Sequence, residues 1–220
     1  MKTSLITLLF LVVSLPLDAQ DWSMGVGAGP FVFGDFLENT LQPGNEDGPE
    51  EPGTLTLSAA TRAGVAVDLE RSFSERFAIR LEGTFTRAPL SIRGSGDGTE
   101  FDAGTLEVST FMVPLVFRIN PRGAFRFHLH GGPALALYRV ETPEGSGASE
   151  PAFAGTQQEW GVAFGGGVAW WVSDRFAIEG NLTDILTSSP IDEEDLPDVP
   201  GLEVLRPHNV HTTVGVRWRF

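Results

Sequence analysis

The chain of 220 residues contains no cysteine, so it can form neither a disulfide framework nor a metal site built on thiolates. Its only lysine is Lys2, and its 15 lysine and arginine residues face 29 aspartate and glutamate residues, which gives a formal net charge of −14. Nucleic-acid binding needs clusters of basic side chains, so this balance argues against a nucleic-acid partner. After the first apolar stretch, no run approaches the roughly 20 apolar residues that a transmembrane helix needs.

The first 19 residues have the layout of a secretory signal peptide. Lys2 supplies a positive charge, residues 5–13 form an apolar stretch that is too short to span a bilayer, and Ala19 offers a small residue for cleavage. The alternative is a membrane-anchoring helix, which is disfavoured because no stop-transfer pattern follows. We therefore predict an exported protein with a signal peptide at 1–19 and one domain at 20–220.

The rest of the chain alternates between extended segments and connectors of two lengths. Eight segments are predicted to be strands: 22–33, 55–69, 77–90, 106–119, 125–140, 159–172, 176–186 and 208–220. The connectors at 70–76, 120–124 and 173–175 are short, whereas the others are long and rich in Gly, Pro, Asp and Glu. Short turns at one end and long loops at the other are typical of bacterial outer-membrane barrels, with the turns in the periplasm.

The predicted strands alternate between two faces. In the last segment, one face carries Val210, Thr212, Val214, Val216, Trp218 and Phe220, and the other carries His211, Thr213, Gly215, Arg217 and Arg219. In the second segment, the same alternation places Leu57, Ala59 and Val65 on one face, which we expect to be the lipid-facing outer face. A period of two indicates a strand but not a membrane, because a soluble barrel alternates too. The less apolar face carries mainly Gly and Ala with occasional Arg and Glu, and this composition favours a narrow, filled lumen.

We therefore predict an all-β fold, an antiparallel up-and-down transmembrane β-barrel of eight strands with short periplasmic turns and long acidic extracellular loops. Aromatic residues near the strand ends fit the interfacial girdles of such barrels. Pro30, Pro114 and Pro133 fall inside predicted strands, where each removes a ladder donor. Because a closed barrel has no free edge to accommodate them, we predict local bulges at these three positions.

Four motifs follow one another in an informative order. They are residues 111–118 with the sequence FMVPLVFR, the Gly131-Gly132-Pro133 strand ending at Tyr138, the Ser-Asp-Arg-Phe turn at 173–176, and the terminal Trp218-Arg219-Phe220. In this order they resemble the small eight-stranded outer-membrane β-barrel proteins (OmpA/OmpX/OmpW-like barrel domains) over essentially the whole chain after residue 19. The resemblance implies residence in the bacterial outer membrane, contact with its lipid and lipopolysaccharide, and insertion by the outer-membrane assembly machinery. Members serve as anchors, adhesins, narrow pores or receptors, and a few modify lipids, so no single activity is implied.

Charged residues on the inward-facing positions form the first candidate site. They are Arg62, Asp68, Arg80, Glu82, Arg126, Glu179, Arg217 and Arg219. In a narrow barrel, buried charges must pair or be hydrated. We predict an Arg–Glu network that fills the lumen and leaves little conductance. The alternative is a water-filled pore in which the same groups set the ion preference.

The acidic residues concentrate in the long connectors, which form the second candidate site. Roughly 19 acids and two arginines lie within 34–54, 91–105, 141–159 and 187–206, and the densest run is Asp192, Glu193, Glu194 and Asp195. Solvated loops kept soluble by like charge account for this pattern. The alternative is binding of Ca²⁺, which would bridge the loops to lipopolysaccharide phosphates. No Asp-x-Asp-x-Asp-Gly spacing supports a calcium site.

The four histidines are the remaining candidates for chemistry. His128 and His130 share one face of the fifth predicted strand, whereas His208 and His211 lie on opposite faces of the last. A His-x-His pair on one face is a possible half of a metal site, but polar packing in the lumen also explains it. We predict a monomer without cofactor, metal or catalytic site, and a structural, narrow-pore or surface-interaction role. The alternatives are a lipid-modifying outer-membrane barrel enzyme and a soluble exported β-barrel that binds an apolar ligand.

Overall fold

The computed structural model describes residues 22–41, 53–95, 100–141, 155–191 and 202–220. The predicted signal peptide at 1–19 lies outside these residues. Within them, no helix is long and apolar enough to cross a membrane. The strands are β1 (Trp22–Phe33), β2 (Leu37–Leu41), β3 (Gly53–Ala59), β4 (Arg62–Ser72), β5 (Phe77–Gly94), β6 (Glu100–Met112), β7 (Leu115–Arg118), β8 (Phe125–Glu141), β9 (Gly155–Trp171), β10 (Phe176–Thr187), β11 (Leu202–Val204) and β12 (His208–Arg219).

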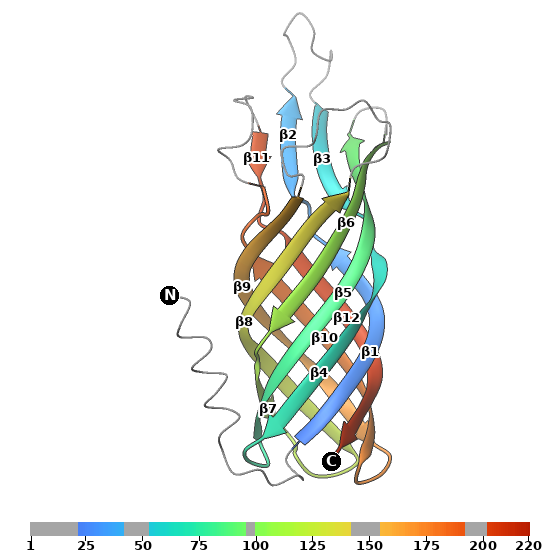
Figure 1. The fold of residues 1–220 in the computed structure, drawn as a ribbon, viewed down its shortest axis with the longest axis vertical. Coiled ribbons are helices and arrows are strands. Elements are labelled where there is room, and N and C mark those ends of the chain that lie inside the picture. The colour runs from blue at the N-terminus through green and yellow to red at the C-terminus, as the bar shows by residue number, and fades with distance from the viewer. Residues whose placement is uncertain (1–21, 42–52, 96–99, 142–154, 192–201) are drawn as a thin grey trace, which may run out of the picture.

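The strands close into a barrel (Figure 1). Antiparallel pairing runs from β1 through β4, β5, β6 with β7, β8, β9, β10 and β12, and β12 pairs back with β1. β6 and β7 count as one strand, because both pair with β5 on one side and with β8 on the other. The predicted all-β, antiparallel barrel of eight strands is therefore confirmed.

The two ends of the barrel differ (Figure 1). Tight turns at 73–76, 119–124 and 172–175 lie at one end, which we call the inner end. β2, β3 and β11 lie at the opposite, outer end, where β3 pairs with β2 and with the outer part of β5. β2 and β11 fall in segments that the sequence predicts to be loops, and that part of the prediction is wrong. A five-residue stretch such as Leu37–Leu41 is too short to show the alternation of apolar and polar residues that marks a strand. It becomes a strand because its backbone forms hydrogen bonds with β3.

The second predicted strand is interrupted between β3 and β4. From the Leu57–Ile92 pair to the Val65–Phe85 pair, the chain advances eight residues on one side and seven on β5. One extra residue in a strand moves every following side chain to the other face. Leu57 and Ala59 therefore point into the barrel and are buried, which corrects the prediction that they face outward with Val65.

The three prolines do not produce the predicted bulges. The register between β8 and β9 is unbroken through Pro133, and that between β1 and β4 is unbroken through Pro30. Pro114 lies between β6 and β7, but both keep one register against β8. The prediction is wrong because a proline lacks only the N–H donor. The carbonyl oxygens of Pro114 and Pro133 still accept hydrogen bonds from the backbone N–H groups of Arg80 and Val113.

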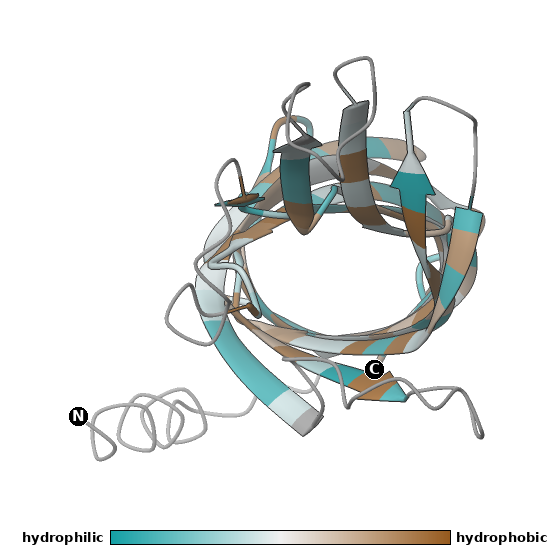
Figure 2. Cartoon of the chain, turned by 90° about the horizontal axis from the view of Figure 1, so that it is seen from above, coloured by the Kyte–Doolittle hydropathy of each residue, from teal (hydrophilic) through white to brown (hydrophobic). Residues whose placement is uncertain are grey.

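Large apolar side chains surround the outside of the barrel. Each of the eight barrel strands presents at least one that is between 47% and 63% exposed: Val26, Val67, Phe85, Phe111, Leu129, Phe164, Leu182 and Val214. Seen from above, hydrophobic and hydrophilic bands alternate along the strands (Figure 2). Soluble proteins rarely expose a continuous apolar surface of this extent, whereas lipid chains require one. This exterior fits a transmembrane barrel and disfavours the soluble alternative.

Candidate functional site

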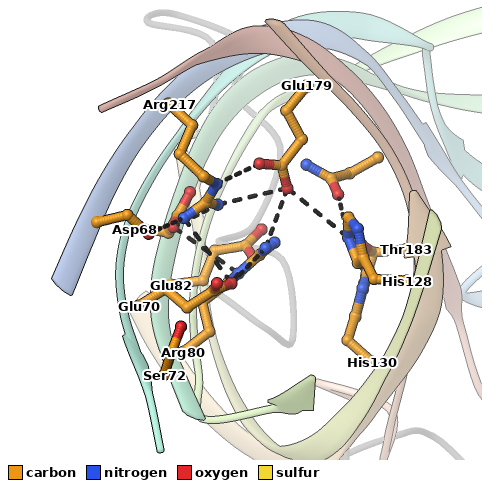
Figure 3. A network of polar contacts seen from close by, with 12 residues as sticks. Asp68, Glu70, Ser72, Arg80, Glu82, His128, His130, Glu179, Thr183 and Arg217 are labelled. Carbon is orange, nitrogen blue, oxygen red and sulfur yellow. Dashed lines mark hydrogen bonds and ion pairs between the residues drawn. The ribbon is translucent and has the colours of Figure 1, made fainter. Parts of the chain in front are cut away.

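Seven charged side chains meet inside the inner half of the barrel, and Figure 3 labels all of them except Arg118. This ion-pair network comprises Asp68 and Glu70 of β4, Arg80 and Glu82 of β5, Arg118 of β7, Glu179 of β10 and Arg217 of β12. All seven project to the inside because each lies on the inward-facing parity of its strand. The closed circuit of strands then brings together residues that are far apart in the sequence.

Arg80 spans the lumen. Its Nη2 atom lies 2.7 Å from Oε2 of Glu70 and 3.0 Å from Oε1 of Glu179, and the three side chains are 2%, 4% and 5% exposed. β5 and β10 lie on opposite sides of the circuit, so the Arg80–Glu179 pair bridges the barrel from wall to wall. Charges buried in this way are stable only when they are paired and hydrogen-bonded. Arg80 meets this condition through Nε and Nη2, whereas its Nη1 atom has no hydrogen-bond partner among the described residues and lies 3.9 Å from Oε2 of Glu82.

Arg217 connects the network to the wall formed by β1 and β4. Its guanidinium donates to Glu179, to Oδ1 of Asp68 at 2.7 Å and to Oγ of Ser23 at 3.0 Å. Gly25 on β1 makes room for these groups, because a Cβ atom there would lie 2.2 Å from Oδ2 of Asp68. The backbone of β1 therefore packs directly against the carboxylate, and a small polar pocket remains beside this wall, bordered by Gly27, Asp68 and Glu179 among others.

The structure brings together five of the eight predicted inward-facing residues: Asp68, Arg80, Glu82, Glu179 and Arg217. Arg62 is not among them, because it begins β4 at the strand break and is exposed. Arg126 is also separate, since it lies at the inner end with its guanidinium carbon 4.7 Å from the centre of the Trp171 ring. Both residues lie at strand ends. An inward-facing position therefore places a charged side chain in the network only if the residue also lies within the packed part of the lumen.

Sequence reasoning missed two members of the network. Glu70 follows the predicted end of its strand, although it continues the inward parity of Asp68. Arg118 lies within a predicted strand but was not selected, and its Nη2 atom is 2.5 Å from Oε1 of Glu70 and 2.8 Å from Oγ of Ser72. The alternation carries the signal for both residues, and a misplaced strand end hides only Glu70.

His128 and His130 lie deeper in the barrel, next to the network (Figure 3). Both are buried, and each has a polar partner on β10: His128 Nε2 is 3.0 Å from Oδ1 of Asn181, and His130 Nε2 is 2.9 Å from Oγ1 of Thr183. Among the described residues, no group of three or more His, Cys, Asp or Glu side chains is arranged to hold a metal ion. The pair is therefore engaged in packing across the β8–β10 side of the lumen.

The other two histidines lie on opposite faces of β12. His211 is 1% exposed inside the barrel, and its ring stacks on that of Phe31 at a centroid distance of 4.8 Å. His208 is 61% exposed on the outer face, with Nδ1 3.1 Å from Oδ2 of Asp184. His211 marks the boundary where the polar interior gives way to an apolar one.

The outer half of the interior is apolar, which the sequence reading did not anticipate. An outer apolar cluster fills it: Phe31, Phe33, Phe36, Leu57, Ala59, Ala88, Leu90, Leu106, Val108, Ala136, Tyr138 and Ile191. Tyr138 places its hydroxyl 2.8 Å from Oγ1 of Thr187 and accepts a hydrogen bond from Asn209 Nδ2 at 2.5 Å. A small cleft remains at the outer edge of the cluster, bordered by Phe36, Tyr138 and Ile191 among others. The extra residue between β3 and β4 contributes to this cluster by turning two of its members inward.

Two predicted features are peripheral or outside the described residues. The acidic run Asp192, Glu193, Glu194 and Asp195 lies outside them, so its proposed contact with Ca²⁺ stays a prediction. At the inner end, Arg122 donates to both carboxylate oxygens of Glu75 at 2.9 and 3.0 Å. This hydrogen bond raises the pKa of Arg122, and the pair ties two neighbouring turns together.

Comparison with known proteins agrees with this geometry at the level of the fold. No protein-family model matches the chain, and no curated protein matches it by sequence. Among solved structures, the outer membrane protein OprG from Pseudomonas aeruginosa matches with a TM-score of 0.61 and 12% identity, over 92% of this chain and 96% of that chain. Neisserial surface protein A matches with a TM-score of 0.56 and 10% identity, over 91% of this chain and 97% of that chain. The chain therefore has the fold of the small outer-membrane β-barrel proteins.

Proposed function

We propose that this chain is an integral protein of the bacterial outer membrane whose barrel is closed along its axis and supports an interaction surface at the outer end. The observation that carries the proposal is that the interior is filled at two successive levels by different chemistry. The ion-pair network occupies the inner half, and the outer apolar cluster occupies the outer half.

The two levels oppose the passage of ions for different reasons. At the inner level, an ion would have to displace paired groups such as Arg80 and Glu179, which span the lumen at 3.0 Å. At the outer level, an ion would have to leave water for a space lined by side chains such as Phe31 and Leu90, which are 5% and 2% exposed. Transfer of an unpaired charge into apolar surroundings is very unfavourable. The two levels act in series, so either one alone is sufficient to stop conduction.

A closed barrel leaves the outer end as the part that meets partners. β2, β3 and β11 extend the wall at that end (Figure 1). The proposed contacts are outer-membrane lipid and lipopolysaccharide, with Ca²⁺ at the acidic connectors, and insertion of the monomer by the outer-membrane assembly machinery. The proposal includes no nucleic-acid partner.

The proposal also includes no catalytic activity. The observation that supports this part is that His128 and His130, the pair best suited to chemistry, are buried and directed at Asn181 and Thr183. Phospholipase or deacylase turnover by purified, folded protein in detergent would contradict it and would favour the lipid-modifying alternative.

Planar-bilayer recordings test the closed barrel. Refolded protein, with and without millimolar Ca²⁺, is expected to give no defined current. A variant that opens only the inner level, Arg80→Ala with Arg217→Ala, and one that opens only the outer level, Phe31→Ala with Tyr138→Ala, should also be silent. The variant that combines all four changes should conduct. Heat-modifiable migration in detergent gels verifies folding of each protein, and a steady current from the unaltered protein would refute the proposal.

The outer cleft favours a second candidate function, which is binding of a small apolar molecule. Its lining is almost wholly apolar and includes Leu57, Leu90 and Leu106. A ligand that binds only the folded state raises the unfolding midpoint. A short alkane should therefore stabilise the unaltered protein but not a Leu57→Trp variant in which the cleft is filled, and equal shifts in both would rule out this cleft.

A further inference from the structure

The inner mouth of the barrel carries two arginines on one tryptophan ring. Trp171 is the last residue of β9, Arg126 is the second residue of β8, and Arg219 is the last residue of β12. Their guanidinium carbons lie 4.7 Å and 4.1 Å from the centre of the Trp171 ring. The two positive groups are thus within about 9 Å of each other, and all three side chains are partly exposed at the mouth.

The backbone holds this arrangement in place. The Trp171 N–H donates to the carbonyl oxygen of Ala124 at 2.7 Å, and the Arg219 N–H donates to that of Arg175 at 2.8 Å. Arg126 uses its Nε atom on the carbonyl oxygen of Gly123 at 3.2 Å. The side chains are therefore presented from fixed strand ends and not from a long connector.

The two guanidinium groups have no carboxylate partner within the described part of the chain. Ion pairs up to 4.0 Å account for the other inward-facing arginines Arg80, Arg118 and Arg217, but none involves Arg126 or Arg219. Like charges held this close repel one another, and stacking on an indole offsets only part of that repulsion. Asp174 in the neighbouring turn interacts favourably with both groups but forms no ion pair with either, and an anion bound at the mouth would offset the remaining repulsion.

The stacking also prepares the guanidinium groups for an anion. A guanidinium that lies over an aromatic ring uses its face for the ring, and its N–H donors remain in the plane around its edge. Arg126 keeps its two terminal amino groups after the bond to Gly123, and Arg219 adds a second fork. Two such guanidinium groups can donate to separate oxygens of one ligand, and a phosphate group, with three or four oxygens, allows this better than a carboxylate with two.

We propose that Arg126, Arg219 and Trp171 form a binding site for a phosphate group at the inner mouth of the barrel. The guanidinium groups supply the charge-assisted hydrogen bonds, and the indole keeps them apart and oriented. The site lies on the periplasmic side if the orientation in the proposed function holds, but the binding itself does not depend on whether the barrel conducts. The phosphate would come either from a soluble phosphate ester or from a lipid headgroup of the facing leaflet.

Phosphorus NMR of inorganic phosphate tests the site on the folded full chain in a non-ionic detergent. At constant ionic strength, the phosphate resonance should broaden saturably with added protein. Each of Arg126→Gln and Arg219→Gln should raise the apparent Kd about tenfold or more, the scale of a lost hydrogen bond to a charged group. The matched control is Arg122→Gln, which alters a neighbouring arginine already paired with Glu75 and should leave the Kd unchanged.

Repeating the titration in lipid nanodiscs distinguishes the two sources. Retention of phosphate binding in nanodiscs indicates a soluble phosphate ester, and its loss there with retention in detergent indicates that headgroups occupy the site. The proposal is overturned if the unaltered protein gives no saturable broadening in detergent. It is equally overturned if Arg122→Gln weakens binding as much as Arg126→Gln, because the effect would then be one of net charge alone.

Discussion

Replacing Arg217 by methionine isolates the contribution of the ion-pair network to stability. Methionine retains most of the length and apolar packing of arginine but removes its charge. Arg217 is 4% exposed and contacts Glu179, Asp68 and Ser23. Its loss leaves buried carboxylates without one of their guanidinium partners, and removal of one partner from a buried ion pair costs about 3–5 kcal/mol. We expect a loss of stability of that size.

Urea unfolding of the refolded protein in lipid vesicles, followed by tryptophan fluorescence, measures the effect. With a slope of about 1–3 kcal/mol/M, the midpoint should fall by at least about 1 M. Arg122→Gln, at an exposed ion pair, should leave the midpoint unchanged and serves as the control. A loss below about 1 kcal/mol for Arg217→Met would refute the reasoning, because it would mean that water already solvates the network.

A double-mutant cycle sharpens this test. Glu179→Gln alone should also destabilise the barrel, because Arg80 and Arg217 both lose a buried partner. Combined with Arg217→Met, it should cost less than the sum of the two single changes, with a coupling energy on the order of 0.5–3 kcal/mol. Strict additivity would show that the two groups do not interact in the folded protein.

Three further changes have distinct expected outcomes. Gly165→Ala should prevent refolding in a gel-shift assay, because the new Cβ atom would lie 2.2 Å from a backbone carbonyl oxygen of β10, whereas Gly180→Ala, with its nearest neighbour at 3.9 Å, should refold normally. Tyr138→Phe leaves Asn209 without its hydrogen-bond acceptor and should cost about 1–3 kcal/mol in urea unfolding; no loss would mean that water replaces the hydroxyl. Arg62→Gln should change neither the urea midpoint nor the bilayer recordings, and a loss like that of Arg217→Met would contradict its exposed position.

Much of the candidate site could be predicted from alternation alone. The alternation identifies Asp68, Arg80, Glu82, Glu179 and Arg217, because a β-strand has a period of two and each residue lies within an uninterrupted stretch. Glu70 was missed because its strand runs beyond the predicted end, and Arg62 was wrongly included because its strand begins there. Where a strand ends depends on how far the neighbouring strand continues to form backbone hydrogen bonds with it. The residues of one segment do not contain that information.

The sequence by itself determined the class of the protein: strand periodicity, alternating connector lengths and an apolar face on every strand permit few structures other than a membrane barrel. The tertiary structure alone decided what fills that barrel. A one-residue bulge turned Leu57 and Ala59 inward, and closure of the strand circuit brought Arg80 opposite Glu179 and Arg126 beside Arg219. Periodicity is a property of each strand, whereas register and closure are properties of pairs of strands, so only the folded circuit determines which inward-facing side chains meet.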